Sequence, residues 1–88
     1  MKTQYRKRFL KELALIPSNI RINIEQYVFI EIPSLDSITK SKKIVRMKGY
    51  RNFYKIRFGD YRIGMKVEDD TVIFERALHR REIYRYFP

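Results

Sequence analysis

Three β-type segments, joined by two tight turns, constrain the fold of this chain more than any other feature of its sequence. Phe53–Phe58 and Tyr61–Glu68 alternate aromatic or aliphatic residues with basic ones, and only Gly59-Asp60 separates them. A second short turn, Asp69-Asp70, leads into Thr71–His79, which is rich in β-branched and apolar residues. Because two-residue turns join antiparallel neighbours, these segments predict an antiparallel sheet.

The N-terminal third of the chain predicts two helices. Apolar residues recur at intervals of three and four within Arg6–Ile16, and Pro17 ends that pattern. The same spacing returns after Ser18 or Asn19, either of which can cap a helix, and continues up to Pro33, where we expect the helix to stop. The two segments therefore indicate a helical hairpin.

Together these elements predict an α+β domain. An N-terminal helical hairpin packs on a twisted antiparallel sheet of three to four strands, with Met1–Tyr5 as the candidate edge strand. Arg80–Pro88 is expected to form a short C-terminal helical turn or tail. With 88 residues the chain can bury one core but not two, so residues 1–88 are expected to be a single domain.

The turn at Gly59-Asp60 determines which residues face each other across the first two strands. It sets Arg57 opposite Arg62 and Lys55 opposite Gly64. Like charges directly across a strand pair destabilise a sheet by up to roughly 1 kcal/mol. The arginine pair therefore predicts a bound anion, for which phosphate is the obvious candidate.

Counting residues outward from the Asp69-Asp70 turn in the same way sets Ala77 opposite Arg62 and Glu75 opposite Gly64. One face of the sheet would then carry Lys55, Arg57, Arg62, Lys66, Glu75 and His79. The apolar residues fall on the other face, which the helices must cover. The residue pairing across the two turns therefore predicts a sheet with one basic face and one apolar face.

Three residues stand out in this arrangement. Gly64 and Ala77 are small residues among long basic side chains, which favours a concave face that could admit a strand of nucleic acid. Gly64 is equally consistent with a bulge or with close packing. Arg76 is the one charged residue left on the apolar face.

Positive charge is concentrated in the C-terminal half. The formal net charge is +10, of which residues 1–39 contribute +2 and residues 40–88 contribute +8. A surplus of this kind on a small domain favours nucleic acid, an anionic membrane surface or an acidic protein as partner. The alternative is that the basic surface is solvated by water and has no binding role.

Residue counts exclude several classes of site. Cysteine is absent, so disulfides, thiolate zinc sites and cysteine nucleophiles are excluded. His79 is the only histidine, and we expect neither a metal nor a small-molecule cofactor. No apolar run approaches the roughly 18 residues of a membrane span, and the basic N-terminus lacks the apolar core of a signal peptide, so we expect a cytoplasmic protein with no membrane partner.

Three motifs, in order, resemble those of a known family. Gly49–Arg57 reads GYRNFYKIR, Gly59–Ile63 reads GDYRI, and His79–Arg85 reads HRREIYR. This pattern resembles the RelE/ParE superfamily of bacterial toxins, with its Tyr-x-Ile-Arg strand, Gly-Asp-Tyr-Arg hairpin and His-Arg-Arg-x-x-Tyr tail. The resemblance covers nearly the whole chain, because that family also places two helices before the sheet.

The resemblance implies a toxin of a type II toxin-antitoxin system, held inactive by an acidic antitoxin. In the RelE branch it implies an mRNA interferase, an endoribonuclease that enters the ribosome and cuts mRNA without a metal. In the ParE branch it implies a DNA gyrase inhibitor that is not a nuclease. A degenerate toxin or a plain RNA-binding module is the third interpretation.

The resemblance also implies candidate catalytic residues. They are Lys55, Arg57, Arg62, Arg81 and a tyrosine of the tail, either Tyr84 or Tyr86. This sequence carries Arg57 where a second lysine is familiar in the family, and its tail is shorter. The arginines suit phosphate binding, because a guanidinium makes paired hydrogen bonds to phosphate oxygens but is a poor proton carrier.

His79 is a competing candidate for the general base. Imidazole is the side chain that exchanges protons most readily near neutral pH, although a histidine at a strand end is more often satisfied by the backbone. Basic residues around the sheet are expected to contact RNA without performing chemistry: Lys43, Arg46, Lys48, Arg51, Lys66 and Arg80.

Overall fold

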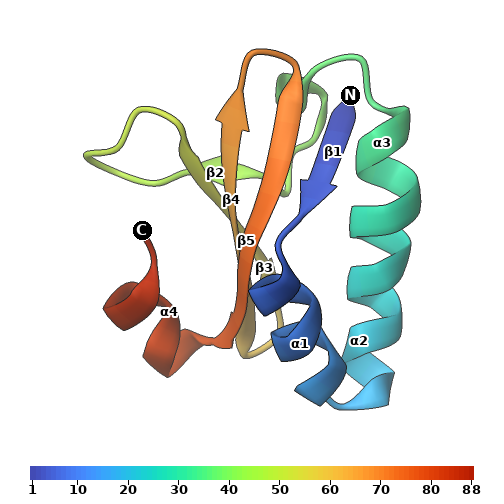
Figure 1. The fold of residues 1–88 in the computed structure, drawn as a ribbon, viewed down its shortest axis with the longest axis vertical. Coiled ribbons are helices and arrows are strands. Elements are labelled where there is room, and N and C mark those ends of the chain that lie inside the picture. The colour runs from blue at the N-terminus through green and yellow to red at the C-terminus, as the bar shows by residue number, and fades with distance from the viewer.

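A computed structural model describes residues 1–88 as a five-stranded sheet with helices on both faces (Figure 1). The elements are β1 (Lys2–Tyr5), α1 (Lys7–Leu15), α2 (Ser18–Glu25), a π-helical stretch (Gln26–Glu31), α3 (Ile32–Ser34), a 3-10 turn (Ile38–Lys40), β2 (Val45–Arg46), β3 (Phe53–Phe58), β4 (Tyr61–Glu68), β5 (Thr71–His79) and α4 (Arg80–Tyr86). The strand order is β1-β5-β4-β3-β2. In Figure 1 the N-terminal helices lie on one side of the sheet and α4 on the other.

The three central strands have the bounds that the sequence predicts, and the predicted α+β architecture is confirmed. The predicted sheet of three to four antiparallel strands is too small, because the sheet has five strands and is mixed. β1 pairs with β5 in parallel, from Lys2 opposite Thr71 to Tyr5 opposite Phe74. A two-residue turn forces an antiparallel neighbour, whereas a strand that reaches the sheet through a long helical connection is free to pair in parallel.

The second helix runs further than predicted. α2 continues without a break through the π-helical stretch into α3, so the helical path ends at Ser34, one residue after Pro33. Pro33 lies in the last turn of this continuous helical path, so its missing N–H interrupts the hydrogen-bond ladder only where the helix is about to end. The prediction that the helix stops at Pro33 is therefore wrong by one residue.

Apolar side chains pack on both faces of the sheet. The larger cluster joins helical residues to one face of β3, β4 and β5; its fully buried members include Phe9, Ile24, Ile56, Ile63 and Phe74. A smaller cluster on the other face joins Met47, Ile83 and Phe87, with Phe53 and Leu78 packed against it. α4 thus covers part of the face that the sequence predicts to be basic.

A β-bulge changes the register between β4 and β5. The predicted pairs hold from Glu68 opposite Thr71 to Met65 opposite Phe74, and the register then shifts by one residue. Beyond the shift, Gly64 faces Arg76, so the prediction that it faces Glu75 is wrong. A bulge places two residues of one strand against one of the other, and every later side chain changes face.

The bulge accounts for the misfit of Arg76. Arg76 moves to the polar face, where Arg62 lies opposite Leu78 and not opposite Ala77. Ala77 moves into the core, where it is 2% exposed. The expectation that small Ala77 hollows the basic face is therefore wrong.

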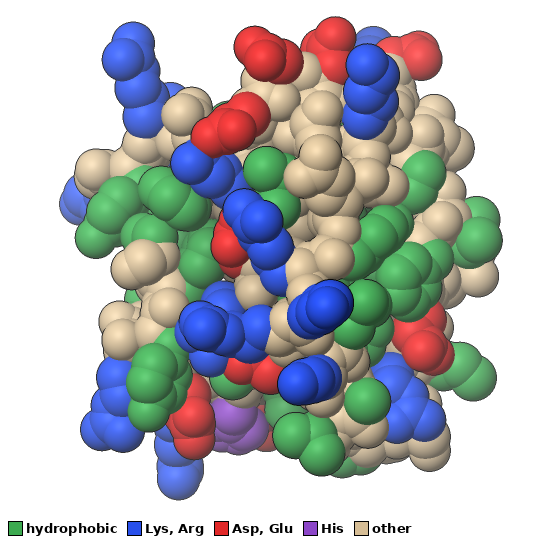
Figure 2. All heavy atoms as spheres, viewed as in Figure 1, with side chains coloured by type: hydrophobic (Ala, Val, Ile, Leu, Met, Phe, Trp, Pro, Cys, Tyr) green, Lys and Arg blue, Asp and Glu red, His purple; other side chains and the backbone are tan.

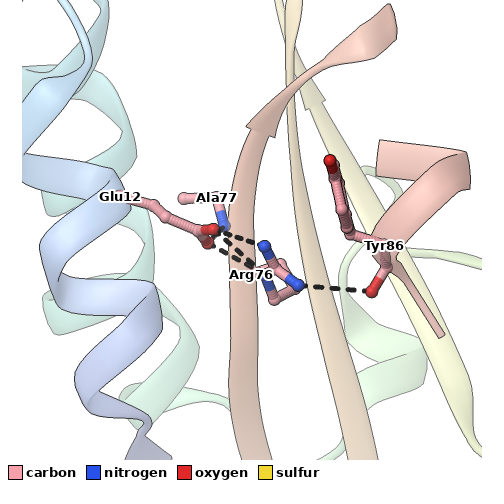
Figure 3. Close-up of polar contacts among 4 residues, drawn as sticks. All are labelled: Glu12, Arg76, Ala77 and Tyr86. Carbon is pink, nitrogen blue, oxygen red and sulfur yellow. Dashed lines mark hydrogen bonds and ion pairs between the residues drawn. The ribbon is translucent and has the colours of Figure 1, made fainter. Parts of the chain in front are cut away.

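Arg76 connects three elements (Figure 3). Its Nη2 lies 2.6 Å from Oε2 of Glu12 on α1, and both side chains of this ion pair are mostly buried. Its Nη1 donates to the carbonyl of Tyr86 on α4 at 3.3 Å. Oε1 of Glu12 also accepts the N–H of Ala77 at 3.0 Å. Because β1 pairs with β5 only as far as Phe74, the Glu12 carboxylate satisfies a strand N–H that β1 does not reach.

Candidate functional site

A hollow of about 280 Å³ collects most of the candidate catalytic residues on the α4 side of the sheet. Its lining consists of Lys43, Val45, Lys55, Arg57, Arg62 and Tyr84. Four of these six residues are cationic and none is acidic. The hollow is therefore suited to an anion.

The two arginines project from the same face, as the turn at Gly59-Asp60 predicts. Arg57 lies directly opposite Arg62 across β3 and β4. Arg62 Nη1 donates to the carbonyls of Gly59 and Tyr61, at 2.8 and 3.0 Å, while Arg57 is exposed and has no ion-pair partner. No carboxylate offsets the repulsion between the two guanidinium groups, so an anion bound between them would relieve it.

Lys55 and Tyr84 meet at the edge of this hollow. The Lys55 ammonium donates to the Tyr84 hydroxyl at 2.5 Å and lies 4.8 Å from the centre of the ring. Tyr84 is 60% exposed, and its neighbour Ile83 is fully buried and anchors α4 to the sheet. Of the two tail tyrosines, Tyr84 lines the hollow, whereas the ring of Tyr86 lies over the Arg76 guanidinium.

Arg81 lies in the first turn of α4 and does not line the hollow. It precedes Tyr84 by three residues, so both side chains project from the same side of the helix. The N–H of Arg80 donates to the Asp60 carbonyl at 2.7 Å, which fastens the start of α4 beside the turn between β3 and β4. The Arg80 side chain forms an exposed ion pair with Asp60 at 3.5 Å.

His79 does not share the face of the other candidates. Past the bulge it lies opposite Tyr61, with the two rings 5.5 Å apart, and it lines a separate hollow of about 230 Å³ that also includes Glu12 and Glu82. Its Nδ1 accepts the N–H of Arg81 at 3.2 Å, which caps α4. The prediction that His79 belongs to the basic face is wrong, because the count behind it assumed an unbroken register.

Gly64 does not open a hollow on the basic face. A Cβ at this position would lie 2.7 Å from the ring of Phe87, which covers the glycine. Both alternative interpretations of Gly64 are confirmed, because the register shift lies between Gly64 and Met65 and the Phe87 ring packs on the glycine.

The predicted RNA-contacting residues fall into separate groups. Arg46, Lys48 and Arg51 line a hollow of about 460 Å³ in the loop between β2 and β3. Lys66 forms an ion pair with Glu68 at 2.6 Å. Lys43 is part of the first hollow, a placement that the linker sequence gives no means of predicting.

A further basic hollow lies where β1 enters α1. Arg6, Lys7, Arg8, Glu75 and Arg76 surround about 340 Å³. Figure 2 shows Lys and Arg side chains gathered over the middle of the face that it presents. The comparison of net charge between the two halves of the sequence does not reveal this group, although the run of basic residues Arg6–Arg8 indicates it.

Metal-ligating clusters and membrane-spanning helices are both absent from the structure. No group of three His, Cys, Asp or Glu side chains comes together in a way that could hold a metal ion. None of the helices has the length and apolar character needed to cross a membrane.

Comparison with known proteins identifies the family. A family model described as the ParE toxin of the type II toxin-antitoxin system parDE matches residues 4–84. Toxin RelE3 of Methanocaldococcus jannaschii is 45% identical over 89 residues, which cover 100% of both chains. This chain belongs to the RelE/ParE family of type II toxins.

Solved structures give this RelE-like toxin the same fold as its relatives. In the RelB-RelE antitoxin-toxin complex from Methanococcus jannaschii, a chain 42% identical to this one matches with a TM-score of 0.80, over 97% of this chain and 99% of that one. In the archaeal RelE-RelB complex from Pyrococcus horikoshii OT3, a chain 20% identical matches with a TM-score of 0.68, over 90% and 93%. The second likeness concerns the fold alone.

Proposed function

We propose that this RelE-like toxin is an mRNA interferase, an endoribonuclease that cuts mRNA at the ribosome without a metal ion. The observation that carries the proposal is the hollow itself. It combines Arg57, Arg62 and Lys55 with a tyrosine, Tyr84, and contains no carboxylate. Such a set can bind a phosphate, stabilise added negative charge on it and move protons.

The proposed reaction is a phosphoryl transfer within the RNA. The 2′-oxygen bonds to the adjacent phosphorus while the bond from phosphorus to the 5′-oxygen breaks, which leaves a 2′,3′-cyclic phosphate and a 5′-hydroxyl. The 2′-hydroxyl loses one proton and the leaving 5′-oxygen gains one, so no other reactant is consumed.

Roles follow from the chemistry of each side chain. Arg57 and Arg62 bind the phosphate oxygens and stabilise the charge of the transition state, and Arg81 assists from the first turn of α4. Lys55 and Tyr84 are the proposed pair for the two proton transfers. His79 caps α4 and lines a separate hollow, so we rank it behind Lys55 and Tyr84 as the candidate base.

The proposal also assigns partners and a location. The relatives' structures contain a RelB antitoxin, and a toxin of net charge +10 is complementary to an acidic antitoxin. We propose a cognate acidic antitoxin as the inhibitor, the ribosome and its mRNA as the target, and the cytoplasm as the place of action.

Inducible expression followed by mapping of mRNA 5′ ends tests the proposal. We expect growth arrest with new in-frame 5′ ends for the wild type, and neither for Arg62→Ala or Arg81→Ala. Lys11→Ala removes the same unit charge from the exposed side of α1 and should behave as wild type. Arrest that persists in the two arginine variants would overturn the assignment of the site.

The name of the matching family model favours one alternative, a ParE-type DNA gyrase inhibitor that binds without cutting. Arrest with a DNA-damage response and intact mRNA in the same experiment would establish that alternative. A gyrase binder has no need for Arg57, Arg62 and Tyr84 in one hollow, and for this reason we rank it second.

A further inference from the structure

Lys43 reaches the candidate cleavage site from the linker that precedes β2. It is distant in sequence from Lys55, Arg57 and Arg62, yet it lines the same hollow. We propose that the Lys43 ammonium binds a phosphate of the RNA held in this hollow, next to the two arginines. This inference rests on the proposed function, and it assigns Lys43 to the cleavage site and not to a peripheral RNA contact.

Specific contacts hold Lys43 in place. Its ammonium lies 5.3 Å from the ring centre of Tyr27 and 5.2 Å from that of Phe58, and both rings belong to the buried core. A cation within about 6 Å of a ring centre is attracted by the negative face of the ring. The position of the ammonium is therefore determined by the core and not by the linker alone.

The linker backbone is fastened at the same point. The hydroxyls of Tyr27 and Ser41 are hydrogen-bonded to each other. Ser41 Oγ also accepts the N–H of Lys43 at 3.3 Å. Ser41 thus connects the backbone of Lys43 to the core residue Tyr27, which limits the entropy that an ordered lysine would otherwise lose on binding a phosphate.

The Lys43 charge has no counter-ion in the structure. Lys43 forms none of the four ion pairs of the molecule, and no acidic residue lines the hollow. Ring contacts leave the N–H donors of an ammonium available to oxygen acceptors. Its neighbour Lys42 is also exposed but lines none of the hollows, so Lys42 offers a control with the same charge.

Single-turnover cleavage of mRNA in purified ribosome complexes tests the role of Lys43. We expect Lys43→Ala to lower kcat/KM about tenfold to hundredfold, the usual effect of losing a hydrogen bond to a charged group. Lys43→Arg should recover most of the loss. Lys42→Ala should stay within about twofold of wild type, because Lys42 contributes only to the long-range attraction of RNA, which both alanine variants weaken by the same unit charge. Equal rates for Lys43→Ala and Lys42→Ala would overturn the inference.

A stability measurement separates binding from packing. Lys43→Met keeps the aliphatic stem over Tyr27 and Phe58 but loses the charge, so it should unfold near the wild-type temperature and yet cleave as slowly as Lys43→Ala. If Lys43→Met cleaves at the wild-type rate, the role of Lys43 is packing and the proposal fails.

Binding of inorganic phosphate gives a readout that does not need cleavage. In NMR titrations of the isolated toxin, phosphate should shift the side-chain signals of Lys43 and Arg57 together, and the Arg57 shift should weaken in Lys43→Ala but not in Lys42→Ala. Shifts at Arg57 that are the same in both variants would contradict the inference. If the wild type binds phosphate through Lys43 but cuts no mRNA, the proposed function fails and the anion site stands.

Discussion

Lys55 and Tyr84 form the contact on which the proposed proton transfers in the hollow depend. Because the ammonium donates to the phenolic oxygen, the hydroxyl proton of Tyr84 is free to point toward another acceptor. The leaving 5′-oxygen is such an acceptor, and the Lys55 charge would then stabilise the phenolate that forms. This geometry favours Tyr84 as the general acid.

Replacing the hydroxyl of Tyr84 tests that role. Tyr84→Phe keeps the ring but removes the proton donor, so we expect kcat to fall about 10²-fold to 10⁴-fold with little change in KM. Tyr86→Phe is the matched control, because the structure uses the ring and carbonyl of Tyr86 and not its hydroxyl. Comparable losses of kcat in both variants would contradict the choice of Tyr84.

Some residues of the hollow could be predicted from the sequence and others could not. Arg57 and Arg62 follow from a two-residue turn, which fixes the register across β3 and β4. Tyr84 follows only from the resemblance to a family. Lys43 could be predicted as a basic residue that contacts RNA, but its place in the hollow could not, because that place depends on aromatic rings contributed by other elements.

At the level of elements, the ion pair between Glu12 and Arg76 connects α1, β5 and α4. Glu12→Gln leaves the Arg76 guanidinium largely buried without a counter-charge, so we expect a loss of about 2–4 kcal/mol in the free energy of unfolding. Glu68→Gln breaks a pair of the same length that is more exposed, and should cost less than about 1 kcal/mol. Chemical denaturation of both variants measures the difference, and equal losses would show that burial of the pair is unimportant.

Packing between β4 and the residue after α4 gives a second prediction at this scale. Gly64→Ala forces a methyl group against the ring of Phe87, which should cost about 1–3 kcal/mol of stability. In a Phe87→Leu background the same substitution should cost much less, because the ring is gone. A double-mutant cycle measures this coupling, and strictly additive losses would contradict the contact.

The bulge in β5 marks the limit of what turn counting can predict about elements. The bounds of β3, β4 and β5 follow from alternation and turn residues, and the β4–β5 register holds next to the turn. A bulge adds one residue without a strong local signal, so every facing residue beyond it was assigned wrongly, His79 included. Arg76 and Gly64 are the available signals, since a lone charge on an apolar face indicates a shift in register and a glycine within a strand is consistent with a bulge.

At the scale of the whole molecule, the net charge of +10 should make RNA binding strongly dependent on salt. Arg46, Lys48 and Arg51 surround one hollow of the β2–β3 loop. If each neutralises a phosphate, replacing all three with Gln should reduce the slope of log affinity against log salt by about 2 for single-stranded RNA. Titrations at several salt concentrations measure the slope, and an unchanged slope would show that water alone solvates this loop.

The chemistry of the RNA ends tests most directly whether the hollow is a nuclease site. Purified toxin should cut mRNA on programmed ribosomes to give an upstream fragment with a 2′,3′-cyclic phosphate and a downstream fragment with a 5′-hydroxyl. A single 2′-deoxy substitution at the cut should abolish both products. Fragments with 5′-phosphates, cleavage that survives the 2′-deoxy substitution, or intact mRNA would contradict the account.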